Sequence, residues 1–375
     1  MGRSFYKYKC KNISVIVLII TILLYTSFSY SLVNDVYGIL GDAAIPDHFD
    51  TRIAAITGTT PPRLHFIDLT TTPFSVLGSG SGLPGGAPSD IVYYNNFVYY
   101  CTQQSPAVIH KVNAITFAWD SSITLAVNEN DCKSLAIDSN GFIYAGISTP
   151  AGQNWKVVKI GTNPFARIGV LGFGANGTGS GASSSISSDF LYVQSSSTAT
   201  NVAEISLSTF TVISTNTITG GAGGGPADIN VIPILGLGFV DHKGSGGTSP
   251  HSPCSFNINP LGVETCVTIA GTPNPRRVVT DRYNNMVYIT SATVDTVWKF
   301  TSIPFVLVTS LFPSIIAAVD SFNVVSNEVG NSNFLYVTGE LAGSGYVIKI
   351  DLSTFTEVGT LQMTAGANPV ALAIW

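Results

Sequence analysis

Apolar residues in this chain occur in short runs that are separated by turns rich in Gly, Pro, Asn and Ser. Such runs are typical of buried β-strands, because an amphipathic helix needs a longer stretch with a period near 3.6 residues. One strand pattern, in which an apolar pair precedes a Tyr, recurs about every 48 residues or at twice that spacing. The tyrosines of its copies are Tyr99, Tyr144, Tyr192, Tyr288 and Tyr336. Their fixed place in each repeat predicts a structural role, in which they pack between repeats.

A second strand pattern follows each Tyr strand and ends in a polar turn and an apolar residue. Its clearest copy runs from Val347 to Phe355, and Ser255 to Leu261 is a degenerate copy. The final apolar residues of the copies are Phe74, Phe117, Phe165, Phe210, Leu261, Phe305 and Phe355. These copies, about 47 residues apart, predict seven repeats, although the degeneracy of the fourth and fifth leaves six or eight open.

A third strand pattern, introduced by Pro after Gly or Asn, precedes the Tyr strand. Its copies lie at 86–92, 225–229, 274–279 and 368–372. The last copy has no Tyr strand after it, whereas the first repeat, 50–76, has no introducing strand. We therefore expect the C-terminal strand, 368–375, to pair near the mature N-terminus. The predicted fold class is all-β, a seven-bladed β-propeller of four-stranded blades over residues 50–375, in which the C-terminal strand closes the first blade.

The N-terminal residues have the pattern of a secretory signal. Four basic residues precede an apolar run from Ile13 to Tyr25, and small residues follow at Ser27, Ser29 and Ser31. We predict a signal peptide over 1–29 and a short linker over 30–49. The alternative is an uncleaved signal anchor, although the apolar run is shorter than the roughly 20 residues that span a bilayer.

Composition and charge restrict the class of partner. The chain is 45% hydrophobic and only 10% charged, with a net charge of −5. Removing residues 1–29 takes away four basic residues and no acidic ones, which makes the mature chain more acidic. Nucleic-acid binding needs a basic surface, so we expect no nucleic-acid partner.

Cysteine usage also favours export. Cys10 lies in the signal, and the other four cysteines form an even set that suggests disulfides rather than a metal site. Cys254 and Cys266 lie symmetrically about Pro260, where we expect a hairpin turn, so they would pair across two strands. Cys101 and Cys132 pair by elimination. Asn176 begins the sequon Asn-Gly-Thr in a Gly/Ser loop and is a predicted glycosylation site.

The repeats resemble NHL and YVTN-type propeller repeats. The resemblance is carried by 134–144, with its acid, small-residue turn and aromatic strand, by 277–288, and by the phrase at 349–355. It implies a propeller fold, in a group that contains binding scaffolds, adhesion modules and a minority of enzymes. The sequence departs from the WD40 pattern, because Trp119-Asp120 occurs once and lacks a Gly-His partner.

One cluster of charged residues is unusual in a chain so poor in charge. In a propeller, the loops into the innermost strands and those between second and third strands share one face, here called the mouth face. The segments expected there carry Asp241, His242, Lys243, His251, Arg276, Arg277 and Lys133. Arg suits anions and His can act as a general base, so the cluster predicts an anion or sugar pocket or a catalytic site. The alternative is that these are ordinary solvated loop residues. We expect no metal and no cofactor.

Three functional hypotheses follow. The first is a secreted or cell-surface binding or adhesion module for an extracellular glycan or protein. The second is a lyase or hydrolase-type propeller enzyme that uses the His and Arg residues of the mouth face, which would need to converge on one point. The third is a structural component of an extracellular matrix or wall. In each case we expect a monomer, with membrane contact only through an uncleaved N-terminal segment.

Overall fold

The computed structural model describes 17 stretches of the chain. They are 52–59, 61–80, 83–148, 155–173, 182–195, 200–218, 226–242, 252–258, 260–262, 264–269, 275–281, 284–291, 295–313, 324–326, 334–341, 343–365 and 369–375. The chain divides into two compact units, Met1–Ala44 and Ile45–Trp375. The described residues all belong to the second unit and begin at Arg52, so the predicted signal over 1–29 and the whole predicted linker over 30–49 lie outside them.

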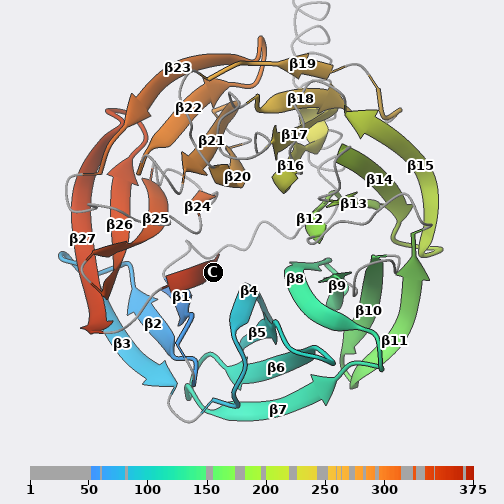
Figure 1. The fold of residues 1–375 in the computed structure, drawn as a ribbon. Coiled ribbons are helices and arrows are strands. Elements are labelled where there is room, and N and C mark those ends of the chain that lie inside the picture. Colours follow the sequence, from blue (N-terminus) through green and yellow to red (C-terminus); the bar gives the residue numbers. More distant parts are fainter. Residues whose placement is uncertain are drawn as a thin grey trace, which may run out of the picture. The chain divides into compact units, whose positions relative to one another are not determined.

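Within the second unit, the described strands form seven antiparallel four-stranded sheets that surround an axis (Figure 1). Blade 1 comprises β28 (Pro369–Ile374), β1 (Arg52–Thr57), β2 (Leu64–Asp68) and β3 (Ser75–Gly80). Blade 2 comprises β4 (Pro88–Tyr94), β5 (Phe97–Thr102), β6 (Val108–Asn113) and β7 (Trp119–Thr124). Blade 3 comprises β8 (Asn130–Ile137), β9 (Phe142–Ser148), β10 (Lys156–Thr162) and β11 (Phe165–Gly172). Blade 4 comprises β12 (Ala182–Ile186), β13 (Phe190–Ser195), β14 (Thr200–Ser206) and β15 (Thr211–Ile218).

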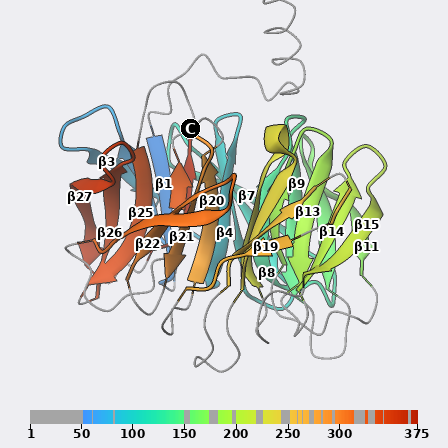
Figure 2. The same ribbon diagram turned by 90° about the horizontal axis from the view of Figure 1, so that it is seen from above.

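The other three blades follow the same plan. Blade 5 comprises β16 (Pro226–Ile232), β17 (Leu237–His242), β18 (Cys254–Asn257) and β19 (Glu264–Cys266), with the short 3₁₀ helix η1 (Pro233–Leu235) between its first two strands. Blade 6 comprises β20 (Pro275–Asp281), β21 (Met286–Ser291), β22 (Val297–Thr301) and β23 (Val306–Leu311). Blade 7 comprises β24 (Val324–Ser326), β25 (Phe334–Leu341), β26 (Ser344–Asp351) and β27 (Thr356–Ala365). The first strand of each blade lies nearest the axis, and the strands run along the thickness of the ring (Figure 2).

The C-terminal strand closes blade 1, as the sequence predicts. β28 pairs antiparallel with β1, with Ala55 opposite Leu372 and Ile53 opposite Ile374. Beyond this ladder, Arg52 and Trp375 exchange two backbone hydrogen bonds of 3.0 Å. Because the last strand completes the first sheet, the ring has seven blades and no open seam whose unpaired strand edges would favour association.

The apolar core is divided among the seven seams between blades. Each of seven clusters of buried residues draws its members from two neighbouring blades, including the clusters on both sides of blade 1. In β28, for example, Ala371 and Ala373 face blade 2, whereas Leu372 faces blade 7. Each blade is therefore apolar on both faces and buries them only when both neighbours are present.

The predicted aromatic positions meet at these seams. The apolar residue that ends each second pattern packs on an aromatic residue of the preceding blade. The pairs, with ring-centroid distances, are Phe117–Phe66 (4.4 Å), Phe165–Tyr99 (5.6 Å), Phe210–Tyr144 (5.9 Å), Phe305–Phe239 (5.5 Å), Phe355–Tyr288 (6.1 Å) and Phe74–Tyr336 (6.4 Å). Leu261 packs against the cluster that contains Tyr192. The structural role predicted for the tyrosines is confirmed.

The acid, the small-residue turn and the aromatic strand at 134–144 also have a local structural explanation. Asp138 accepts backbone hydrogen bonds from Asn140 (3.0 Å) and Phe142 (2.8 Å) through one carboxylate oxygen. Its other oxygen accepts a 2.9 Å hydrogen bond from the Tyr144 hydroxyl. Gly141 has a φ of 79°, which a residue with a side chain rarely adopts. The acid, the glycine and the Tyr therefore form one hairpin that places the Tyr ring in the seam.

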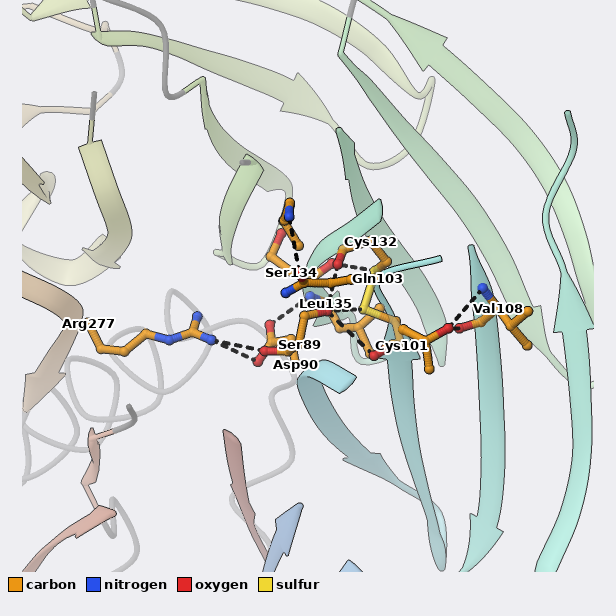
Figure 3. The surroundings of a disulfide bond; sticks show 11 residues. Ser89, Asp90, Cys101, Gln103, Val108, Cys132, Ser134, Leu135 and Arg277 are labelled. Carbon is orange, nitrogen blue, oxygen red and sulfur yellow. Dashed lines mark hydrogen bonds and ion pairs between the residues drawn. A yellow bond between two sulfur atoms is a disulfide. The ribbon is translucent and has the colours of Figure 1, made fainter. Parts of the chain in front are cut away.

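Both predicted disulfides are present, and they differ in what they connect. Cys254 and Cys266, with Cα atoms 4.1 Å apart, join β18 to β19 within blade 5. Cys101 and Cys132, with Cα atoms 5.9 Å apart, join β5 of blade 2 to β8 of blade 3 (Figure 3). The first disulfide holds a hairpin, whereas the second fixes two blades to each other. In the described part of the chain, no helix has the length and apolar character needed to cross a membrane.

Candidate functional site

Four of the strands nearest the axis begin with an irregularity in their pairing. The register shifts between Pro88 and Asp90 in β4, between Cys132 and Ser134 in β8, between Pro226 and Ile229 in β16, and between Pro275 and Arg277 in β20. Such bulges bend a strand and re-aim its side chains. When the proline is counted as the first position, the third position is Asp90 in β4, Asp228 in β16 and Arg277 in β20. Equivalent positions of different blades therefore carry opposite charges.

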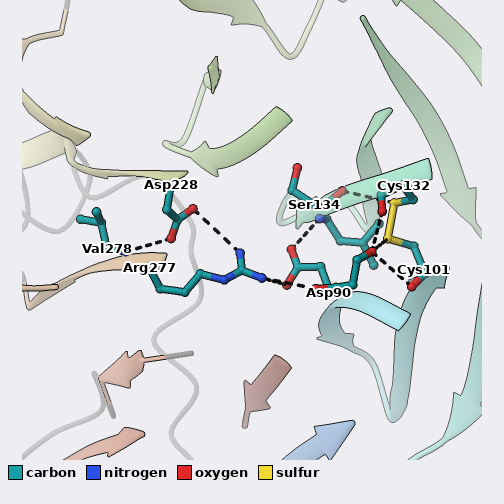
Figure 4. A network of polar contacts seen from close by, with 9 residues as sticks. Asp90, Cys101, Cys132, Ser134, Asp228, Arg277 and Val278 are labelled. Carbon is teal, nitrogen blue, oxygen red and sulfur yellow. Dashed lines mark hydrogen bonds and ion pairs between the residues drawn. A yellow bond between two sulfur atoms is a disulfide. The ribbon is translucent and has the colours of Figure 1, made fainter. Parts of the chain in front are cut away.

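Arg277 reaches across the axis and connects these acidic residues. Its Nη2 atom lies 3.6 Å from Asp90 Oδ1, in blade 2, and its Nη1 atom lies 4.0 Å from Asp228 Oδ1, in the adjacent blade 5 (Figure 4). The same Nη2 group donates a hydrogen bond of 3.3 Å to the carbonyl oxygen of Ser89. Blades 6 and 2 are not neighbours in the ring, so Arg277 joins parts of the molecule that share no seam. We call Asp90, Asp228 and Arg277 the axial cluster.

The two carboxylates are held by the blades that follow them in the chain. Asp90 Oδ2 accepts a 2.7 Å hydrogen bond from the Leu135 amide, and Asp228 Oδ2 accepts one of 2.9 Å from the Val278 amide. The side chains of Arg277, Asp90 and Asp228 remain 18%, 14% and 10% exposed. The cluster therefore offers fixed donors and acceptors that solvent can still reach.

The electrostatics of the cluster are not those of an anion site. Two carboxylates surround one guanidinium group, so the cluster carries a formal charge of −1 when both acids are ionised. Burial raises the pKa of Asp90, and the nearby Arg277 and the Leu135 amide oppose this shift. Because Arg277 is already paired, an added anion would have to compete with two carboxylates.

Of the residues predicted on the mouth face, the structure describes the side chains of Arg277, Asp241 and Lys133. Arg277 belongs to the axial cluster. Asp241, in β17, is fully buried and so does not present its carboxylate on the exposed mouth face. Lys133 lies at the bulge of β8, at the position equivalent to Arg276, and its Nζ atom lies 3.4 Å from Gln103 Oε1.

The remaining predicted residues lie, by their side chains or entirely, outside the described part of the chain. His242 ends β17 and Arg276 lies in β20, but the structure describes only the backbone of these two residues. Lys243, His251 and Asn176 lie wholly outside the described residues. The convergence of His242 and His251 therefore stays a prediction.

Sequence reasoning missed Asp90 and Asp228. A signal for both exists, because the introducing segments 86–92, 225–229 and 274–279 align on their prolines. The third position of that alignment is Asp, Asp and Arg in a chain with few charges. A position that is charged in three of the four Pro-introduced copies, with Ala371 in the fourth, indicates a side chain that faces the axis.

Comparison with known proteins supports the fold and no single activity. No family model matches the sequence, and no curated protein matches it. A hypothetical selenium-binding protein from Sulfolobus tokodaii aligns with a TM-score of 0.67 and 11% identity, over 88% of this chain and 95% of that chain. Hydrazine synthase from Kuenenia stuttgartiensis aligns with a TM-score of 0.59 and 13% identity, over 81% and 90% of the two chains. The WD40 domain of Toxoplasma gondii coronin aligns with a TM-score of 0.58 and 12% identity, over 87% and 79%. At these identities the likeness concerns the fold alone.

Proposed function

We propose that this protein is exported and that its propeller is a binding module for an extracellular glycan, bound at the axial cluster on the mouth face. The observation that carries the proposal is the Arg277 guanidinium fixed between Asp90 and Asp228, with all three side chains partly exposed. The NHL/YVTN-type resemblance and the signal-like N-terminus belong to the same proposal. Two disulfides support export, because disulfides persist in oxidising compartments.

A neutral sugar suits the chemistry of the cluster better than an anion does. A sugar hydroxyl donates one hydrogen bond and accepts others, so adjacent hydroxyls match a carboxylate and a guanidinium that lie side by side. Hydrogen bonds to charged groups are also stronger than those between neutral groups. An anion would gain from Arg277 alone and would be repelled by Asp90 and Asp228. The sugar interpretation of the mouth face is therefore favoured over the anion interpretation.

Calorimetric titration of the mature protein tests this proposal. The ligands are the methyl glycosides of glucose, galactose and mannose, with inorganic phosphate as the anion for comparison. We expect binding of at least one neutral glycoside, and a loss of about tenfold or more in affinity in Arg277→Met, because a charge-assisted hydrogen bond contributes about 1.5–3 kcal/mol. Preference for phosphate, or equal affinity in Arg277→Met, contradicts the proposal.

A matched control separates binding from general damage. Arg167 also pairs with a buried carboxylate, that of Glu129, at 2.6 Å, but it lies on the outer strand β11. Arg167→Met removes the same side chain and breaks a comparable ion pair away from the axis. It is expected to keep the glycoside affinity of the unmodified protein. A glycoside that binds equally poorly to both variants indicates loss of structure rather than loss of a site.

A structural role in an extracellular matrix or wall is the second candidate, and one observation favours it. The outer strand β23 carries Val306, Leu307 and Val308 with exposures of 46%, 42% and 51%, and no charged residue. Edge strands of soluble proteins usually carry charges or Pro that prevent association. Self-association at rising concentration in sedimentation experiments, abolished by Leu307→Lys, supports this role. The enzyme hypothesis has no comparable observation among the described residues.

A further inference from the structure

The disulfide that joins blades 2 and 3 lies next to the axial cluster. Cys101 and Cys132 are both fully buried, and they are 31 positions apart in the chain. Ser89 lies against this bond, with its Oγ atom 3.2 Å from Cys101 Sγ. The Ser89 hydroxyl also donates a 2.6 Å hydrogen bond to the carbonyl oxygen of Cys132. One residue therefore contacts both halves of the disulfide.

The same residue holds the guanidinium group of the axial cluster. The Ser89 carbonyl accepts the hydrogen bond from Arg277, and the next residue, Asp90, pairs with that guanidinium (Figure 3). The other oxygen of Asp90 is bound to the amide of Leu135, three residues beyond Cys132 (Figure 3). The position of Asp90 thus depends on the distance between blade 2 and blade 3, which is the distance that the disulfide fixes.

We propose that the Cys101–Cys132 disulfide is a positioning device for the axial cluster, so that tight ligand binding there requires this bond. The inference rests on the proposed function for its ligand, but its structural part can be tested without any ligand. Without the covalent bond, β5 and β8 are held only by packing and hydrogen bonds, and the hydrogen bond between the Leu135 amide and Asp90 opens more often. Arg277 then keeps Asp228 as its ion-pair partner but loses a fixed Asp90.

The effect should be specific to this disulfide. A binding constellation tolerates displacements of about 0.5 Å before its geometry is lost. The second disulfide, Cys254–Cys266, lies between β18 and β19 within blade 5, and its two strands are already joined by a short hairpin. Its removal should loosen that hairpin and leave the distance between blades 2 and 3 unchanged. The chain therefore supplies its own matched control.

The experiment compares two double variants of the full mature chain, Cys101→Ser with Cys132→Ser, and Cys254→Ser with Cys266→Ser. Amide hydrogen exchange is measured first, without ligand. We expect exchange at the Leu135 amide to become about tenfold faster or more in the first variant and to stay unchanged in the second. Exchange at the Val278 amide, which is bound to Asp228, is expected to stay unchanged in both. Unchanged exchange at Leu135 in the first variant overturns the proposal.

Titration with the three methyl glycosides is the second measurement. We expect the first double variant to bind about tenfold more weakly than the unmodified protein and the second to bind equally well. Equal affinity in all three proteins overturns the positioning role and leaves the proposed function intact. If no glycoside binds the unmodified protein but exchange at Leu135 accelerates, the proposed function fails and the positioning role stands.

A single substitution keeps the inference testable if the first double variant does not fold. Ser89→Ala leaves the disulfide in place and removes the hydroxyl that contacts both of its cysteines. We expect faster exchange at the Leu135 amide in this variant as well, by a smaller factor than in the double variant. Exchange at Leu135 equal to that of the unmodified protein contradicts the link from the disulfide through Ser89 to the cluster.

Discussion

Closure of the ring by the C-terminal strand can be tested with Leu372→Ala. Leu372 lies in β28, is 5% exposed, and packs in the seam between blades 1 and 7 against a cluster that includes Ile53, Tyr336 and Val347. The substitution keeps the backbone pairing of β28 with β1 and removes only the part of the side chain that fills the seam. It therefore tests whether packing of the last strand stabilises the whole ring.

The expected loss follows from the buried atoms. Leu→Ala removes three carbon atoms, and transfer from water stabilises each buried CH₂ group by about 0.8 kcal/mol. The vacated space adds a further term, because neighbouring side chains relax only partly into a cavity. We expect the free energy of unfolding to fall by about 3 kcal/mol, within a range of about 2–5 kcal/mol for buried Leu→Ala substitutions.

Equilibrium unfolding in guanidinium chloride measures this loss. Leu307→Ala is the matched control, because it is the same chemical change on the outer strand β23 at a residue that is 42% exposed. We expect the control to lose less than about 1 kcal/mol. Equal losses in the two variants, or a loss below about 1 kcal/mol in Leu372→Ala, would refute the view that β28 closes the ring by packing into the seam between blades 1 and 7.

Three further predictions concern the axis, one seam and the N-terminus. Arg277→Met leaves Asp90 and Asp228 without their common cation, so the free energy of unfolding, measured by urea titration, should fall by about 2 kcal/mol at pH 7. This loss should be smaller at pH 4, because burial raises the pKa of Asp90 and its carboxylate then takes up a proton. Burial lowers the pKa of His110 to about 4, so the folded state binds fewer protons than the unfolded state between about pH 6.5 and 4. As the pH falls through that range, the unfolding free energy of the unmodified protein should therefore fall by on the order of 3 kcal/mol relative to that of His110→Phe. Parallel pH profiles of unfolding free energy for the two proteins would contradict this. Intact-mass measurement of the exported protein should show a chain that begins near residue 30, whereas a full-length mass would indicate an uncleaved anchor.

The fold could be predicted from the sequence because its signals are local and repeated. Each strand is a short apolar run, each turn has its own polar residues, and the seam aromatics recur at fixed places in every repeat. The Tyr strands and the seven final apolar residues therefore predict seven blades, although the degenerate fourth and fifth repeats leave six or eight open. The ring closure followed from two incomplete repeats at 50–76 and 368–372, whose missing strands complement each other.

The axial cluster could not be predicted in the same way. Asp90 and Arg277 occupy equivalent positions of the introducing strand, but they lie in blades that share no seam, so their place in the repeat does not show that they meet across the axis. Their side chains reach the axis because bulges re-aim them. The sequence predicts Asp241 on the mouth face because this residue precedes a polar loop. Both faces of a blade are buried, however, so alternation along β17 does not separate an inward from an outward residue. The pairing of Cys101 with Cys132 can be predicted by elimination, because the expected hairpin already pairs Cys254 with Cys266.

The axial cluster as a glycan site is the central functional claim, and the side-chain NMR signal of Arg277 tests it most directly. The Nε–Hε resonances of the arginines are followed while the methyl glycosides of glucose, galactose and mannose are added to the mature protein. The account predicts a saturable shift of the Arg277 resonance with at least one glycoside and no shift of Arg167, which pairs with Glu129 away from the axis. A glycoside that binds without moving the Arg277 resonance, or the absence of any binding, would contradict it.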